Sequence, residues 1–136
     1  MQFKKTATFA ALALTALTVG TALPAHAGSG GVCGSERVCL YENEDFNTGS
    51  GDHWRDITGD DSDLRNNHWK DSNGSESTDG MDNETSSIKT RGCYATLYQN
   101  VGFTGAQTHW TINADDGKLS NNNVGDNRTS AIKVWC

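Results

Sequence analysis

Residues 82–89 read DNETSSIK, and the stretch recurs with few changes as DNRTSAIK at residues 126–133. A second pair of matching stretches lies upstream of these, with LYENEDF at 40–46 and LYQNVGF at 97–103. The spacing from tyrosine to phenylalanine is the same in both copies, and a His-Trp pair follows each of them. The chain is therefore built from one unit that occurs twice, and its fold has to be interpreted from that unit.

The two copies differ in length. We place the first repeat at about residues 38–92 and the second at about 93–136. The first copy holds about a dozen additional residues between Trp69 and Met81, nearly all of them Ser, Gly, Asp and Asn. Such residues cannot build a core, so they predict a solvated loop. A tolerated insertion is the favoured interpretation, and a projecting contact loop is the alternative.

The rest of the repeats indicates β-structure. Short stretches that mix β-branched, aromatic and polar residues, bounded by Gly, Asn and Asp, predict strands. They lie at 38–41, 86–89, 95–98 and 131–135. No window carries an apolar stripe at helical spacing long enough to bury a helix. The sequence thus predicts an all-β fold of the sandwich or barrel type.

The amino terminus is typical of a signal peptide. Lys4 and Lys5 precede a run of small and apolar residues, and the run ends in a small-x-small sequence at 25–27. The run is too short and too rich in Thr and Ala for a membrane anchor. We therefore expect cleavage of residues 1–27, secretion, and no membrane association of the mature form. Residues 28–136 then form a single domain.

The charge of the mature part restricts its partners. The whole chain carries 11 basic and 17 acidic side chains, and removal of Lys4 and Lys5 leaves 9 against 17, a net charge of −8. Nucleic acids and anionic lipids need Lys and Arg to replace their counterions, so neither is expected to bind. An acidic surface favours cations or a basic protein.

All four cysteines, Cys33, Cys39, Cys93 and Cys136, lie in the part expected to be exported, where disulfides form. Four cysteines allow three pairings. The short spacing of the first two and the position of the others at the repeat ends favour Cys33 with Cys39 and Cys93 with Cys136. Zinc ligation is disfavoured, because no Cys-x-x-Cys occurs and the histidines are not spaced as partners.

The repeated motifs, Tyr-x4-Phe-x-Gly at the start and Asn/Asp-Asn/Asp-x-x-Ser/Thr-Ser near the end, resemble those of the βγ-crystallin superfamily, in particular its microbial calcium-binding members. The resemblance covers about residues 38–136. It implies two Greek-key motifs packed as a βγ-crystallin-like sandwich, with the two Asp-Asn segments as paired loops at one end. Three features depart from the pattern: an additional residue before Gly49, the insertion, and Ala131 in place of Ser.

The resemblance also implies two calcium sites. In microbial members, a site joins the carbonyl of the third motif residue and the hydroxyl of the fifth to a group from the other repeat, and Ca²⁺ takes six to eight such oxygens. One site would use Glu84 and Ser86, and the other Arg128 and Ser130. The complete predicted metal set is Asp82, Asn83, Glu84, Ser86, Asp126, Asn127, Arg128, Ser130 and the backbone near Glu42 and Gln99. The Asn side chains would serve across the pair.

The two predicted sites are unequal. Arg128 brings a positive charge to the second motif, and Ala131 removes a hydroxyl that supports its loop. We therefore expect the tighter site at Ser86. Asp and Asn also occur in ordinary turns without a metal, but two aligned copies favour calcium.

A second resemblance concerns the front of the domain. Cys33-x5-Cys39 followed by LYEN is similar to secreted actinobacterial proteins grouped with a crystallin-fold metalloproteinase inhibitor. It implies peptidase inhibition and a secreted protease as partner. The alternatives are a killer-toxin-like antimicrobial protein and a glycan-binding module that uses an exposed Trp54 or Trp69 as its platform.

Catalysis is not expected. His53 and His109 occupy equivalent repeat positions, which favours structural roles for both. No Ser or Cys stands in a recognised nucleophile arrangement. The acidic runs at 60–63 and 115–116 lie in polar segments, whereas a glycosidase acid needs an apolar pocket that raises its pKa.

Overall fold

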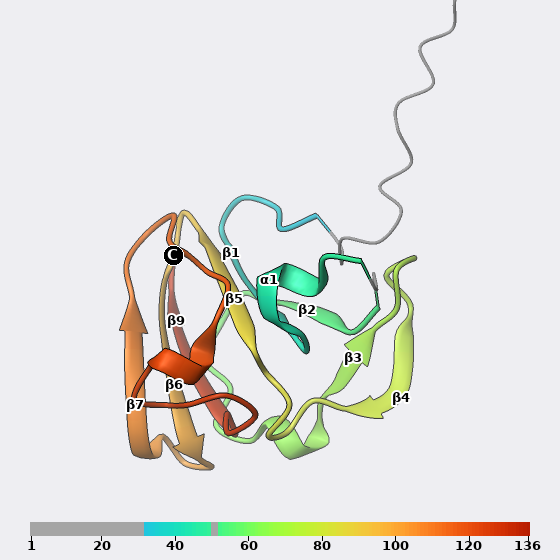
Figure 1. Ribbon diagram of the computed structural model, residues 1–136. Coiled ribbons are helices and arrows are strands. Elements are labelled where there is room, and N and C mark those ends of the chain that lie inside the picture. The colour runs from blue at the N-terminus through green and yellow to red at the C-terminus, as the bar shows by residue number, and fades with distance from the viewer. Residues whose placement is uncertain (1–31, 50–51) are drawn as a thin grey trace, which may run out of the picture.

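The computed structural model describes residues 32–49 and 52–136, so the expected signal peptide at 1–27 lies outside the described residues (Figure 1). The strands predicted at 38–41, 86–89, 95–98 and 131–135 are confirmed. In chain order the elements are β1 (Arg37–Tyr41), α1 (Glu44–Asn47), β2 (Trp54–Ile57), η1 (Leu64–Asn66), β3 (His68–Lys70), β4 (Glu76–Gly80), β5 (Ser87–Arg91), β6 (Tyr94–Asn100), β7 (Thr104–Trp110), β8 (Asp115–Asp116), η2 (Leu119–Asn121) and β9 (Ala131–Trp135).

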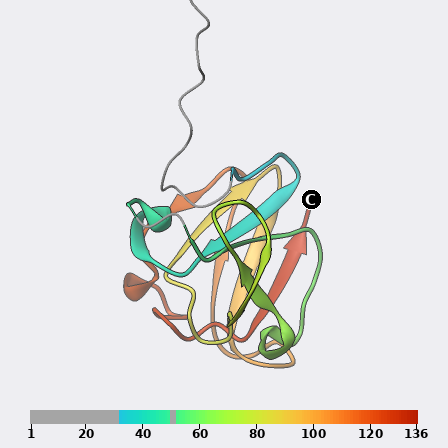
Figure 2. The same cartoon turned by 90° about the vertical axis from the view of Figure 1, so that its right-hand side faces the viewer.

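Two antiparallel sheets form the molecule. The first has the strand order β4-β3-β2-β1-β5-β8, and the second has the order β7-β6-β9 (Figure 1). Seen from the side of β3 and β4, the second sheet lies behind the first (Figure 2). None of the helices in this part of the chain has the length and hydropathy needed to span a bilayer.

Each repeat gives one segment to the sheet of the other. From the second repeat, β8 pairs with β5 through Ile88 and Lys89. In return, Asp61 of the first repeat bridges Ile132 in β9, and both main-chain hydrogen bonds between the two residues measure 2.8 Å. This exchange makes two interlocked Greek-key motifs, so the predicted all-β sandwich is confirmed.

The core lies between the two sheets. Val38 and Leu40 from β1 and Ile88 from β5 meet Leu97 from β6 and Ile132 from β9, all with 0% exposure. Complete burial of one such side chain stabilises the fold by about 2 kcal/mol. Because the two repeats share this core, neither repeat buries its apolar face without the other.

The two favoured disulfide pairings are both confirmed. Cys33 bonds to Cys39 and packs with Tyr41 on the outer face of β1. Cys93 bonds to Cys136 and joins the residue before β6 to the residue after β9. Each of the two sheets therefore carries one disulfide.

The insertion is more ordered than predicted. In place of a solvated loop, residues 68–80 form the hairpin β3–β4, which continues the first sheet beyond β2 through the pairing of Trp54 with Lys70. Most side chains of β4 are exposed. The prediction failed because main-chain pairing at a sheet edge needs no apolar side chain. Trp69, with 0% exposure, anchors the hairpin in the core.

Candidate metal sites

The two repeated Asp-Asn loops lie side by side at the same end of the sandwich (Figure 1). Asn83 N donates to Thr129 O at 3.0 Å, and Asn127 N donates to Thr85 O at 3.1 Å. Both asparagines have positive φ, 59° for Asn83 and 53° for Asn127, a conformation that asparagine tolerates better than most residues. The loops are therefore held together by reciprocal main-chain contacts.

The serine of each loop meets the asparagine of the other. Ser86 Oγ donates to Asn127 Oδ1 at 3.2 Å, and Ser130 Oγ donates to Asn83 Oδ1 at 3.3 Å. Two oxygens that bind one Ca²⁺ at nearly a right angle lie roughly 3.3 Å apart, given the usual bond lengths. Each Ser-Asn pair thus already has the spacing that a shared calcium ion requires.

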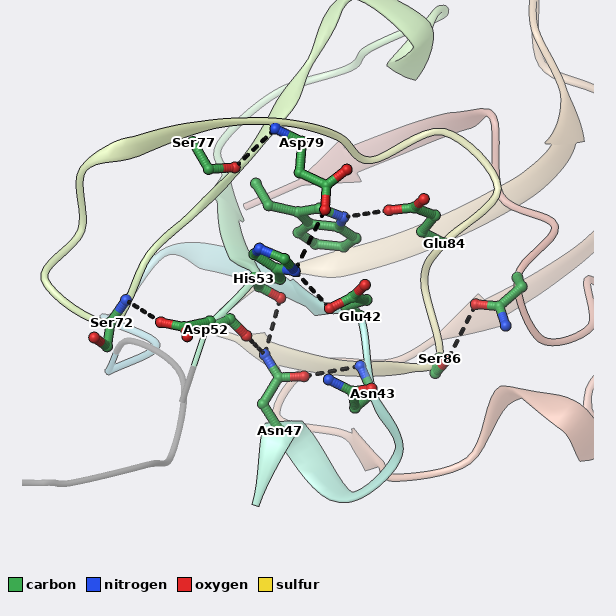
Figure 3. Close-up of polar contacts among 12 residues, drawn as sticks. Glu42, Asn43, Asn47, Asp52, His53, Ser72, Ser77, Asp79, Glu84 and Ser86 are labelled. Carbon is green, nitrogen blue, oxygen red and sulfur yellow. Dashed lines mark hydrogen bonds and ion pairs between the residues drawn. The ribbon is translucent and has the colours of Figure 1, made fainter. Parts of the chain in front are cut away.

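An acidic cavity of about 520 Å³ opens beside the first of these pairs. The side chains around it include four carboxylates, three amides and one hydroxyl, and no basic group is among them. Its electrostatic field therefore favours a cation. Figure 3 shows Glu42, Asn43, Glu84 and Ser86 on the segments that surround it. The lining residues are Glu42, Asn43, Glu44, Asn83, Glu84, Ser86, Asp126 and Asn127.

A smaller cavity of about 300 Å³ lies beside the second pair. It is lined by Asn83, Gln99, Asn100 and Arg128, so a guanidinium takes part where the first cavity has carboxylates. Its oxygen donors are neutral. A divalent cation would meet repulsion from Arg128 there, which agrees with the expected weaker second site.

The side chains of two of the four residues expected to contribute backbone oxygens are already engaged. Glu84 Oε2 accepts a hydrogen bond from Trp69 Nε1 at 3.0 Å, and Gln99 Nε2 donates to Val124 O at 3.0 Å. These contacts are compatible with a role for main-chain oxygens at both positions, which is the use that the sequence predicts.

Buried oxygens without a donor occur at matching positions of the two loops. Among the described residues, Asp82 Oδ1, Thr85 Oγ1, Asp126 Oδ1 and Thr129 Oγ1 have no hydrogen-bond partner. An unpaired buried oxygen costs roughly 1–3 kcal/mol. A divalent cation bound beside the loops would offset part of that cost for the carboxylates. The donor set therefore fits calcium, a hard cation that prefers oxygen.

The structure brings most of the predicted metal residues together, although Asp82 and Ser130 stand beside the cavities and not in their linings. The sequence prediction missed Asn43, Glu44 and Asn100. The recurrence of Leu-Tyr-x-Asn in both repeats was a signal for the two asparagines.

The comparisons with known proteins concern the fold. No protein-family model matches this chain, and no curated protein matches it significantly. Solved structures do match. One comes from work on the evolution of the eye lens βγ-crystallin domain fold, with 22% identity over 77% of this chain and 93% of that chain and a TM-score of 0.59. The chain has the βγ-crystallin fold.

Two further structures agree with this assignment. A βγ-crystallin from Ciona intestinalis is 17% identical over 73% of this chain and 99% of its own, with a TM-score of 0.55. A βγ-crystallin from an archaeon is 18% identical over 74% of this chain and 98% of its own, with a TM-score of 0.53. The similarity thus extends across the whole βγ-crystallin domain and includes a microbial protein.

Within this βγ-crystallin fold, the tryptophans considered for glycan binding are buried. Trp69 has 0% exposure, and Trp54 has 9%. The Trp54 indole N–H donates to Asp71 O at 2.9 Å, so its polar edge is also occupied. The glycan platform proposed on either residue is wrong, because both rings are taken up by packing.

A charge cluster attaches the hairpin to the sheet. Asp56 on β2 pairs with Lys70 on β3 and with Arg37 on β1. Burial alone would raise the pKa of Asp56, but the Lys70 hydrogen bond and charge, together with the Arg37 hydrogen bond, outweigh burial and hold that pKa below its usual value. The ionised form of Asp56 therefore stabilises the attachment of β3.

Proposed function

We propose that this protein is a secreted, non-catalytic calcium-binding protein with two unequal sites, one in each Asp-Asn loop. The observation that supports this best is the reciprocal contact of Ser86 with Asn127 and of Ser130 with Asn83. Because each contact joins the two repeats, a calcium ion at either one would stabilise the folded form against the unfolded chain. The acidic first cavity would hold the tighter ion.

The sequence and the disulfides support export. Two disulfides are formed, and structural disulfides persist mainly outside the cytosol. Extracellular calcium is abundant enough for modules with dissociation constants of about 10⁻⁴ to 10⁻³ M to be occupied. Calcium would then act as a permanent structural ligand.

Calorimetry tests calcium binding directly. We expect the EDTA-treated protein to bind Ca²⁺ in two events, with the tighter dissociation constant between about 10⁻⁶ and 10⁻⁴ M. Ser86→Ala combined with Ser130→Ala should abolish both events. Ser120→Ala, at an exposed position of helix η2, is the matched control and should bind as the unmodified protein does. Absence of binding in the unmodified protein, or full binding by the double variant, would contradict the proposal.

A role as a peptidase inhibitor is a second candidate. The Cys33–Cys39 disulfide fixes the segment before β1 against the outer face of the first sheet. A rigid, disulfide-held segment resists cleavage, which an inhibitor needs. Assays of a metalloprotease and of a subtilisin-like protease at micromolar concentrations of this protein test the idea. A lack of inhibition in both assays would contradict the inhibitor role and leave calcium binding as the remaining proposal.

A further inference from the structure

Three side chains from separate segments converge near the edge of the acidic cavity. Glu42 follows β1, His53 precedes β2, and Asp79 belongs to the hairpin strand β4. His53 Nδ1 lies 2.6 Å from Glu42 Oε2 and 3.8 Å from Asp79 Oδ2. One ligand atom of each residue falls within 4.8 Å of the other two. Figure 3 shows both carboxylates directed toward the imidazole ring.

We propose that Glu42, His53 and Asp79 form a binding site for a divalent transition-metal ion of the zinc class. One imidazole nitrogen and two carboxylate oxygens are donors that Zn²⁺ accepts at about 2.0 to 2.2 Å. Donors on one tetrahedral ion at these bond lengths lie roughly 3.4 Å apart. The observed separations of 2.6 and 3.8 Å bracket that value. Small side-chain movements therefore suffice for all three to bind one ion.

The backbone at His53 is fixed by its neighbours. His53 N donates to Lys70 O at 2.9 Å, and its carbonyl accepts from Glu42 N at 3.1 Å and from Asn47 Nδ2 at 2.9 Å. These bonds hold the residue at a φ of 62°. The backbone is thus fixed before any ion arrives, and the contact with Glu42 Oε2 orients the ring, which together lower the conformational cost of binding.

The three side chains are also accessible. Exposure is 27% for His53, 31% for Glu42 and 50% for Asp79. An ion can reach the cluster, and a water molecule can fill the fourth position of a tetrahedral shell. Without metal, His53 Nδ1 and Glu42 Oε2 share a short hydrogen bond, which an ion bound between the two atoms would replace.

The donors distinguish this site from the calcium sites. Imidazole suits zinc, copper and nickel, whereas Ca²⁺ takes oxygen ligands. The paired loops offer oxygen alone through their Ser-Asn contacts, but the Glu42–His53–Asp79 cluster includes a nitrogen. The donor atoms therefore select different cations at the two sites, although Glu42 belongs to the cluster and also lines the acidic cavity.

The second repeat shows what the cluster depends on. His109 occupies the position equivalent to His53, yet its Nδ1 bonds to Thr96 Oγ1 at 2.9 Å and its ring stacks on Tyr94. Gln99 replaces Glu42, and the repeat has no hairpin to match Asp79. The inserted hairpin supplies the third ligand, which gives it a function beyond a tolerated insertion.

Calorimetric titration of the purified protein with ZnCl₂, in saturating CaCl₂, tests the site. We expect one Zn²⁺ per chain. His53→Asn, chosen because asparagine accepts positive φ, and Asp79→Asn should each weaken binding by at least about tenfold, since even losing a group that only orients a ligand costs that much. His109→Gln is the matched control and should bind Zn²⁺ as the unmodified protein does.

Several results would overturn the proposal. They are absence of zinc binding up to millimolar concentration, unchanged affinity in His53→Asn or Asp79→Asn, and equal weakening in His109→Gln. Asp79→Asn guards against a folding defect, because Asp79 is exposed. The same titration without calcium separates this proposal from the calcium function. If the protein binds zinc but shows no calcium binding, the result supports the zinc site and contradicts the calcium function.

Discussion

The cavity beside Ser86 is lined by four carboxylates, three from the first repeat and Asp126 from the second, whereas the cavity beside the other Ser-Asn pair is lined by Arg128 and by no carboxylate. The loops themselves are the same in backbone and in their Ser-Asn contacts. The difference therefore lies in the residues around a common frame. A duplicated fold can keep one cation-binding geometry in both halves and still make the halves unequal by charge.

The two disulfides should differ most in how much they stabilise the folded protein. Cys93 and Cys136 are 43 residues apart, and Cys33 and Cys39 are 6 apart. Loop-closure entropy predicts a loss of about 4 kcal/mol when the long link is replaced by two alanines, and about 2 kcal/mol for the short one. Urea unfolding of the two double variants measures both values. Equal losses would mean that chain entropy does not set their contribution.

The glycine of the Tyr-x4-Phe-x-Gly motif should matter more in the second repeat. A Cβ on Gly105 would lie 2.6 Å from Asn100 Nδ2, whereas one on Gly49 would meet no described atom within 4 Å. Both residues have positive φ. We expect Gly105→Ala to cost about 3 kcal/mol and Gly49→Ala about 1 kcal/mol. Thermal unfolding compares them, and a larger loss at Gly49 would refute this reasoning.

The hairpin, which only the first repeat has, should respond to acid through Asp56. The folded-state pKa of Asp56 is lowered, so its stabilisation is complete above the unfolded value near 3.9 and is lost as pH falls through the folded pKa. Asp56→Asn should cost about 2 kcal/mol at pH 7, since Lys70 and Arg37 lose their partner. Unfolding near pH 2 should show a much smaller difference. A difference that stays constant with pH would contradict the assigned charge state.

Arg128→Gln should make the two cavities more alike. Removing one positive charge near a divalent ion should tighten the second calcium site by roughly threefold at low ionic strength, and less at high salt. Calorimetry at two salt concentrations measures the change. Arg55→Gln is the control, because Arg55 pairs with Glu76 on the hairpin and is expected to leave both affinities unchanged.

The repeat made much of this architecture predictable. The recurrence of DNxTS in a family-like motif led to the expectation of paired loops, and strands were predicted from short stretches of β-branched, aromatic and polar residues around Leu40 and Leu97. The cysteine positions favoured the disulfides that form. Periodic features of this kind can be detected in the sequence because each occurs twice.

Features that occur once were missed. The hairpin at 68–80 has no apolar pattern in β4, so its edge pairing left no signal. The pairing of β1 with β2 brings Glu42 beside His53, and the hairpin then adds Asp79 from farther along the chain. The repeat also gave no sign that His53 and His109, which are equivalent in position, have different partners.

Calcium calorimetry on the two single serine variants tests the inequality of the repeats most directly. Ser86→Ala removes the hydroxyl beside the four carboxylates, and Ser130→Ala removes the one that donates to Asn83, which lines the other cavity together with Arg128. We predict that Ser86→Ala eliminates the tighter event and leaves the weaker one, while Ser130→Ala does the reverse. Equal loss of affinity in both variants, or loss of the tighter event in Ser130→Ala, would contradict the account.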